Sequence, residues 1–182
     1  MCSSDLERSL PSFAYRDREV FDRELREVWF RNWIFAAHVS ELPAVGDFSV
    51  SRIGDQEIIL VRTNDAVRGY YNTCRHRGAA LCTEDAGHFH SGLIRCPYHQ
   101  WAYSFDGELV QTPRLDKALQ FDPSDFPLYP VKTAVWEGCV FVNLAPEPAE
   151  TLGAGVQPAV DTLANWDISS LSIAHQFTTT LK

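Results

Sequence analysis

The stretch from residue 74 to residue 99 decides how this chain folds, because it carries two short motifs of metal-binding residues. The first motif is Cys74-Arg75-His76, and the second, 19 residues later, is Cys96-Pro97-Tyr98-His99. Each motif pairs one thiol with one imidazole, and iron and zinc both accept these donors when they converge on one point. The two motifs therefore predict a metal centre held between two loops.

The mixed composition of each motif favours an iron–sulfur cluster over zinc. In a Rieske [2Fe–2S] cluster, two cysteines hold one iron and two histidines replace cysteine on the other. Structural zinc sites usually group ligands of one kind, as Cys-x2–4-Cys followed by His-x3–5-His. A structural zinc site remains an alternative, as does the interpretation that all four residues are unrelated core residues. The favoured interpretation makes Cys74, His76, Cys96 and His99 the cluster ligands and predicts one-electron chemistry.

The residues around both motifs extend the pattern. Residues 74–82 read Cys-Arg-His-Arg-Gly-Ala-Ala-Leu-Cys, and residues 96–107 read Cys-Pro-Tyr-His-Gln-Trp-Ala-Tyr-Ser-Phe-Asp-Gly. Tyr-Asn-Thr precedes them at 71–73, and Trp-Glu-Gly-Cys-Val-Phe-Val-Asn follows at 136–143. From about residue 15 onward, the chain resembles the N-terminal Rieske domain of the α subunit of Rieske-type non-haem iron (aromatic ring-hydroxylating) oxygenases. The resemblance implies that Cys74 and Cys96 bind one iron, and that His76 and His99 bind the other.

The chain resembles the Rieske proteins of cytochrome bc complexes less closely. Those proteins carry two further cysteines, which form a disulfide between the ligand loops, where this chain has Ala79 and Tyr98. They also carry a serine that bonds a bridging sulfur, where this chain has Trp101, although the tyrosine two residues further on is retained as Tyr103. The resemblance therefore implies a cluster of the lower-potential, oxygenase type.

The same resemblance implies a function for the whole protein. In the family, the cluster takes an electron from a reductase or ferredoxin and passes it to a mononuclear Fe(II), typically in a neighbouring subunit of a homotrimer or hetero-hexamer. There O2 is used to hydroxylate an organic substrate, either an aromatic compound or a quaternary amine. The members acting on quaternary ammonium compounds resemble this chain in the run from Cys96 to Trp101. A stand-alone, ferredoxin-like electron carrier is the alternative.

The mononuclear iron of the family is bound by two histidines and a carboxylate beyond the point where this chain stops. His88 and His90 lie between the two motifs, and His175 lies in a segment before that region, so none makes a credible triad. We therefore expect a fragment that is truncated before the catalytic iron domain. It would hold and pass an electron without being a competent oxygenase, and it would contain no catalytic residue.

Composition excludes several other classes. The chain of 182 residues has a net charge of −8 and no basic run, which argues against nucleic-acid or anionic-membrane partners. No signal peptide or membrane-spanning stretch is visible, and an iron–sulfur cluster favours a reducing compartment, so we expect a cytoplasmic protein. The five cysteines do not form a disulfide framework, and we interpret Cys82 and Cys139 as small core residues.

The pattern along the chain predicts a mainly β domain of antiparallel sheets with an N-terminal amphipathic helix, α+β overall. Residues 1–14 are expected to be disordered, and residues 1–6 match the translation of a common library adapter. Residues 15–40 form a helical arm, 41–145 the Rieske domain, and 146–182 a connector and the first strand of a truncated catalytic domain.

Periodicity predicts individual elements within these ranges. The helix is expected over 17–35, with Asp17 as its cap, and its apolar face is expected to pack on the core. Strands are expected near 48–53, 58–61, 67–72, 129–136, 139–144 and 171–182. A further strand is expected to begin around His99 and Trp101. Hairpin turns are expected at Gly54-Asp55, Asp106-Gly107 and Glu137-Gly138. The Pro- and Asp-rich stretch between residues 111 and 130 is expected to be irregular, with a turn of helix near Lys117.

Overall fold

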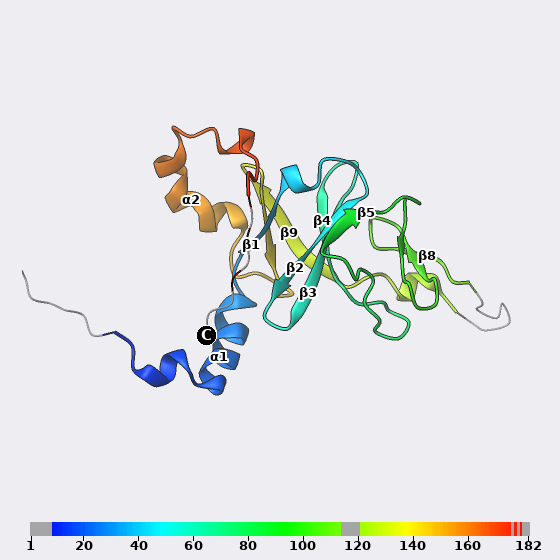
Figure 1. Cartoon of the computed structure of the whole chain (residues 1–182), viewed down its shortest axis with the longest axis horizontal. Coiled ribbons are helices and arrows are strands. Elements are labelled where there is room, and N and C mark those ends of the chain that lie inside the picture. The colour runs from blue at the N-terminus through cyan, green and yellow to red at the C-terminus, as the bar shows by residue number, and fades with distance from the viewer. Residues whose placement is uncertain (1–8, 114–120, 176, 178, 180–182) are drawn as a thin grey trace, which may run out of the picture.

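Two antiparallel sheets form the centre of the computed structural model, which describes residues 9–113, 121–175, 177 and 179 (Figure 1). The larger sheet has the strand order β1-β10-β9-β4-β3-β2-β5, and the smaller has the order β6-β7-β8. The strands are β1 (Ile34–His38), β2 (Asp47–Ile53), β3 (Gln56–Arg62), β4 (Val67–Tyr71), β5 (Ala86–His88), β6 (Ile94–Arg95), β7 (Ala102–Tyr103), β8 (Leu109–Gln111), β9 (Pro130–Trp136) and β10 (Cys139–Asn143). The predicted mainly β fold is confirmed.

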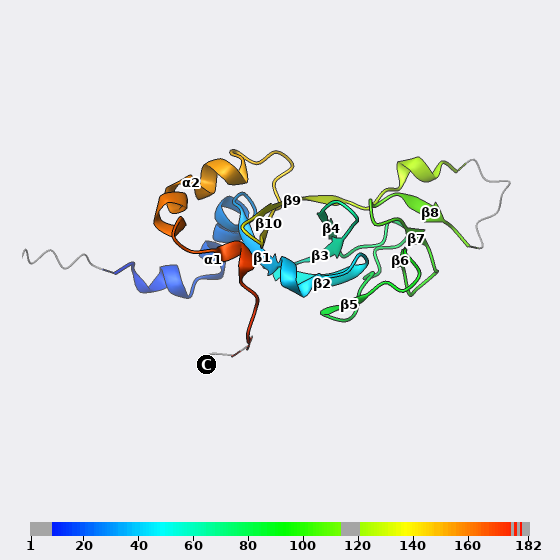
Figure 2. The same ribbon diagram turned by 90° about the horizontal axis from the view of Figure 1, so that it is seen from above.

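The two helices and the small sheet lie at opposite ends of the larger sheet. Figures 1 and 2 both show the helices α1 (Arg18–Glu24) and α2 (Leu152–Leu163) at one end and the small sheet at the other. Short helical turns complete the chain: η1 (Ser12–Tyr15), η3 (Val39–Glu41), η4 (Pro123–Asp125) and η5 (Ile168–Ser170). No helix in the described ranges is long and apolar enough to cross a membrane.

Strand β3 separates two hydrophobic cores, which explains its unbroken apolar run. Successive side chains of a strand point to opposite faces of the sheet. Ile59 and Val61 pack into the core beside the ligand loops, whereas Ile58 and Leu60 pack into the core under β10. All four side chains are fully buried. The central strand therefore links the site to the rest of the sheet.

The three predicted hairpin turns are present. Strands β2 and β3 pair across Gly54-Asp55, β7 and β8 across Asp106-Gly107, and β9 and β10 across Glu137-Gly138. Strand β7 begins at Ala102, after the turn that contains His99, so the strand expected to start at His99 starts later. The other expected strands of the Rieske region are present within two residues of their predicted ends.

The N-terminal helix is shorter than its pattern predicted. Helix α1 begins after Asp17, whose side chain accepts a hydrogen bond from the N–H of Glu19, as expected for a cap. It continues as a π-helical turn over Leu25–Trp29 and then ends. The prediction over 30–35 is wrong, because residues from Ile34 onward instead pair with β10 as an edge strand.

The apolar face of this helix also departs from the prediction. We expected it to pack on the core, but Phe21, Val28 and Trp29 are each about half exposed, and α1 buries none of its residues. Leu25 is the exception, because its methyl groups lie against the β2–β3 turn at Gly54. The helix is thus attached to the sheet at one point rather than along its length.

The C-terminal region begins with helix α2, in the range predicted as a connector. The Thr151 side chain caps this helix by accepting from the N–H of Ala154. The strand expected over residues 171–182 is absent from the described residues of that range. A strand needs a neighbour to hydrogen-bond with, and no described strand pairs with this segment. Residues 1–8 and the turn expected near Lys117 lie outside the described residues. Near the N-terminus, Ser12–Tyr15 forms a 3-10 turn, although residues 1–14 were expected to be disordered.

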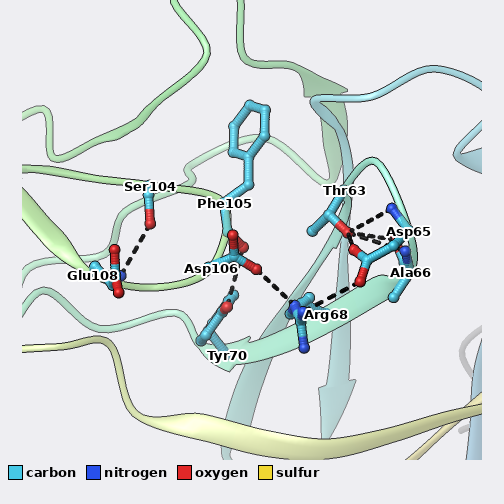
Figure 3. A network of polar contacts seen from close by, with 9 residues as sticks. All are labelled: Thr63, Asp65, Ala66, Arg68, Tyr70, Ser104, Phe105, Asp106 and Glu108. Carbon is cyan, nitrogen blue, oxygen red and sulfur yellow. Dashed lines mark hydrogen bonds and ion pairs between the residues drawn. The ribbon is translucent and has the colours of Figure 1, made fainter.

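A polar network joins the small sheet to the large one, as Figure 3 shows. The Arg68 guanidinium on β4 donates to Asp106 at 2.9 Å, and the Tyr70 hydroxyl donates to the carbonyl of Phe105 at 3.0 Å. Burial raises the pKa of Tyr70 to about 12, so its hydroxyl stays protonated and keeps donating. Gly107 makes this contact possible, because a Cβ there would lie 2.6 Å from the Tyr70 ring.

Comparing alanine substitutions at Gly107 and Gly92 should separate the effect of a steric clash from the effect of backbone strain. Gly107 has φ +86° and Gly92 has φ +70°, but a Cβ on Gly92 would meet nothing within 4 Å. We expect Gly92→Ala to lower the free energy of unfolding by about 1 kcal/mol, through strain alone. Gly107→Ala should lower it by about 2–4 kcal/mol, because the new methyl group also displaces Tyr70. Urea unfolding of both variants measures the difference, and equal losses would contradict the role given to the Tyr70 contact.

Candidate iron–sulfur site

The first ligand loop follows β4 and is closed by two backbone hydrogen bonds. The carbonyl of Cys74 accepts from the N–H of Gly78 at 2.9 Å, and the Cys74 N–H donates to the carbonyl of Ala79 at 2.9 Å. Gly78 has φ +69°, a left-handed conformation that glycine adopts readily. The loop therefore turns tightly at Gly78 and returns to Cys74.

The second ligand loop repeats this design between β6 and β7. The carbonyl of Cys96 accepts from the N–H of Gln100 at 3.1 Å, and the Cys96 N–H donates to the carbonyl of Trp101 at 2.8 Å. Gln100 also has a positive φ, +62°, although it has a side chain. Each loop therefore turns back on its own cysteine at the fourth and fifth residues, and both cysteines are held in equivalent positions.

The structure brings the four predicted ligands together as two pairs. Cys74 and Cys96 are each 2% exposed, so the thiols lie inside the domain. His76 and His99 are half-buried, and their Nδ1 atoms lie 3.0 Å apart. Burial, with His99 and Arg77 nearby, lowers the pKa of His76, which favours the neutral ring that binds metals.

The two pairs have the composition that a two-iron cluster needs. Two buried thiols and two half-buried imidazoles match the ligand set of a Rieske cluster, with two ligands for each iron. A structural zinc site would instead place all four ligands around one ion.

Tyr103 links the second loop to the first. Its hydroxyl lies 3.3 Å from Cys74 Sγ and accepts a hydrogen bond from the Arg75 N–H at 3.1 Å. Burial, reinforced by the neighbouring thiols, raises the pKa of Tyr103, so the hydroxyl keeps the proton that it can donate to sulfur. Such hydrogen bonds tune the reduction potential of an iron–sulfur cluster.

The surroundings of Cys74 shift the pKa of its thiol in opposite directions. Burial raises the pKa of this thiol and Cys96 adds to the effect, whereas the Tyr103 hydroxyl and the His76 backbone N–H lower it. Burial therefore disfavours the charged thiolate when no metal is bound. When a metal is bound, the Tyr103 hydroxyl and the His76 backbone N–H are in place to donate hydrogen bonds to the sulfur. Because ligands must be deprotonated, metal binding at this pair releases protons.

Aromatic rings hold both imidazoles. Trp101 is buried and stacks on His76, with ring centroids 4.7 Å apart, and it packs edge-on against Phe121 and Phe126. Tyr98 stacks on His99 at 3.8 Å, and its side chain is 59% exposed. One histidine is thus supported from the core and the other is covered by a surface ring.

Asn72 is a site residue whose role the sequence analysis missed. Its buried side chain accepts from the N–H groups of Leu81 and Cys82, both at 2.9 Å, and donates to the Cys82 carbonyl and to Glu57. These bonds close the base of the first ligand loop. The sequence shows Asn72 only as a polar residue between a strand and Cys74, and its burial depends on tertiary packing.

Arg75 fastens the same loop on its outer side. Its guanidinium donates to the carbonyls of Pro127 and Asp125, at 2.6 and 3.3 Å, and lies over the Tyr129 ring at 4.2 Å. This contact joins the first motif to a segment about 50 residues later. The sequence gives no indication of it, because the contact is long-range.

Cys82, Cys139 and His38 have surroundings that differ from those of the four predicted ligands. Cys82 is a buried core residue, as predicted, and burial raises its pKa to about 12. Cys139 is only half-buried, so its interpretation as a core residue is confirmed in part. His38 was missed by the sequence analysis; it is buried and caps η3 by accepting from the N–H of Ser40.

A β domain in which two matching loops each present one cysteine and one histidine defines an iron–sulfur protein of the Rieske type. A family model described as the Rieske [2Fe-2S] domain matches residues 32–133, and the chain belongs to this family. Its cofactor is accordingly a Rieske [2Fe–2S] cluster. The assignment of the individual ligands stays a prediction from the motifs and the geometry.

Curated relatives and solved structures extend the comparison. The chain is 35% identical to the glycine betaine monooxygenase oxygenase subunit of Chromohalobacter salexigens, over 92% of this chain and 37% of that one. It is 33% identical to the carnitine monooxygenase oxygenase subunit of Escherichia coli, over 94% and 46%. A quaternary ammonium Rieske monooxygenase in complex with L-carnitine matches with a TM-score of 0.84 and 28% identity, over 93% and 48%. The chain spans less than half the length of these relatives.

Replacing Asn72 should weaken both the fold and cluster retention. Asn72→Ala leaves two buried N–H groups without acceptors, and we expect the free energy of unfolding to fall by about 2–4 kcal/mol. Because the lost bonds close the first ligand loop, iron and acid-labile sulfide per chain should fall as well. Urea unfolding and iron analysis of the purified protein measure the two effects.

Asn143→Ala is the matched control for this experiment. Asn143 is also buried and bonds to backbone groups of Arg31 and Ala145, but in the core away from the ligand loops. We expect this variant to lose stability while keeping its full iron content. Equal iron loss in both variants would show that general destabilisation, and not loop closure, controls cluster retention.

Proposed function

We propose that this chain transfers single electrons through its Rieske cluster as part of an oxygenase that hydroxylates an organic substrate with O2. The supporting observation is the separation of the four ligands into a buried thiol pair and a half-buried imidazole pair. Cys74 and Cys96 would hold the inner iron, and His76 and His99 the outer iron. Bound there, the cluster supplies a one-electron redox centre.

The imidazole side is where electrons would enter and leave. His76 and His99 lie nearer to solvent than the thiols, and the exposed Tyr98 ring covers His99. The residues around them hold the ligands rigidly, through Trp101 on one ring and Tyr103 on the Cys74 sulfur. A reductase or ferredoxin would therefore deliver the electron at this surface.

The relatives support an oxygenase component over a stand-alone carrier. The relatives from Chromohalobacter salexigens and Escherichia coli are named as oxygenase subunits of monooxygenases, and biphenyl dioxygenase subunit α of Paraburkholderia xenovorans is 32% identical over 82% of this chain. We assign the mononuclear Fe(II) that O2 activation requires to residues outside this sequence. We propose a homotrimer or hetero-hexamer for the whole protein, in the cytoplasm.

A quaternary ammonium compound is the substrate class that we propose. The relatives named for glycine betaine and carnitine match over 92–94% of this chain, whereas the biphenyl enzyme matches over 82%. The quaternary ammonium monooxygenase structure also superimposes with a TM-score of 0.84, against 0.74 for a naphthalene 1,2-dioxygenase from Rhodococcus. An aromatic substrate is the second candidate.

Ligand substitutions test the electron-transfer assignment. The reduced protein should give a Rieske electron paramagnetic resonance signal and contain two iron and two sulfide per chain. His76→Ala and Cys96→Ala should each abolish that signal, because each removes one iron ligand. Cys82→Ala is the control, since Cys82 is buried in the same core but is not a predicted ligand. A normal signal in either ligand variant would refute the assignment.

A further inference from the structure

Two histidines outside the predicted cluster ligands lie in the segment that connects the two ligand loops. His88 is the last residue of strand β5, and His90 follows in the turn that leads toward β6. Strand β5 lies at the edge of the large sheet, where His88 is opposite Asp47 and Gly87 is opposite Phe48 on β2. His88 and His90 flank Phe89 in the sequence, and their rings lie beside each other.

The residue between the two histidines anchors them. Phe89 stacks on Phe48 with ring centroids 4.5 Å apart and packs against the core beside the ligand loops. Its N–H also donates to the carbonyl of Gly46 at 2.9 Å. Because Phe89 points inward and its backbone is tied to the neighbouring strand, His88 and His90 are presented outward from a fixed base.

Asp47 orients the ring of His88. The Asp47 carboxylate lies 2.8 Å from His88 Nδ1, and its other oxygen accepts from the Ala44 N–H at 2.7 Å. The contact with Asp47 involves Nδ1, so Nε2 is the ring nitrogen of His88 that would bind a metal ion. Metal-binding histidines are commonly oriented by a carboxylate in this way.

The spacing of the two rings fits shared coordination. The ring centroids of His88 and His90 lie 5.0 Å apart, with an angle of 56° between the planes. Two imidazoles bound to one ion at about 2.0–2.1 Å have centroids roughly 5 Å apart when the angle at the metal is near tetrahedral. The predicted cluster ligands His76 and His99 have nearly the same centroid separation, 4.8 Å.

We propose that His88 and His90 form a second metal site, which binds one divalent ion such as Zn²⁺, Ni²⁺ or Cu²⁺ and is positioned by Asp47. Imidazole nitrogen suits these ions. No third protein ligand joins the pair among the described residues, so water completes the coordination. The site lies on a half-exposed surface and contains no thiolate, which distinguishes it from the cluster.

Titration of the intact, cluster-containing protein tests this proposal. We expect isothermal titration calorimetry with Ni²⁺ and with Zn²⁺ to show one equivalent bound, and His88→Ala and His90→Ala should each weaken binding at least tenfold. Asp47→Asn should weaken it by about 10–100-fold, as expected for a residue that orients a ligand. The zinc X-ray absorption spectrum of the loaded protein should show two imidazole nitrogens at about 2.0–2.1 Å.

His175→Ala is the matched control, because His175 is exposed and distant in sequence from β5. This variant should bind both ions like the unmodified protein. Binding that survives His88→Ala and His90→Ala, or that falls equally in His175→Ala, would overturn the proposal and indicate adventitious surface coordination. The cluster's electron paramagnetic resonance signal should be unchanged in all four variants, so this test is independent of the electron-transfer assignment.

Discussion

The burial of two thiols from separate loops at one place is the constraint on which the rest of this structure depends. Each loop must return to its own cysteine, which both do through bonds to the fourth and fifth following residues. The loops must also meet, and Tyr103 joins them through the Cys74 sulfur and the Arg75 N–H. Burying polar groups without partners is unfavourable. Asn72 accepts from buried N–H groups at the base of the first loop, and the metal of a bound cluster would be the partner of the two thiols.

The large sheet serves the site by holding one of the loops in place. Strand β4 leads directly into the first loop, β3 packs against the same core as both cysteines, and the Arg68 and Tyr70 contacts fix the small sheet that carries the second loop. The second core, under β10, holds the opposite face of β3. Because interiors are close-packed, a change in either core is transmitted to the ligand loops through β3.

The sequence predicts the features that depend on residues close together in the chain. The predicted ligand pairs depend on residue type and spacing, and the hairpins depend on glycine turns, so both could be predicted without a structure. Strand β1 could not, because the residues from Ile34 follow a helical pattern and become a strand only beside β10. Asn72 and Arg75 act through partners 9 to 52 residues away, which no local pattern reveals. The strand expected over 171–182 is absent from the described residues of that range for the converse reason, since alternation without a neighbouring strand does not form a sheet.

The two histidine pairs place nearly the same ring spacing in different surroundings. Their centroid separations differ by only 0.2 Å (5.0 against 4.8 Å). His76 and His99 are stacked under aromatic rings beside two buried thiols, an environment of soft ligands and low dielectric that suits an iron–sulfur cluster. His88 and His90 have a carboxylate and solvent instead, which suits a hydrated divalent ion. Strand β5 connects the two loops of the cluster, so an ion bound there would restrain the backbone that joins them without contacting the redox centre.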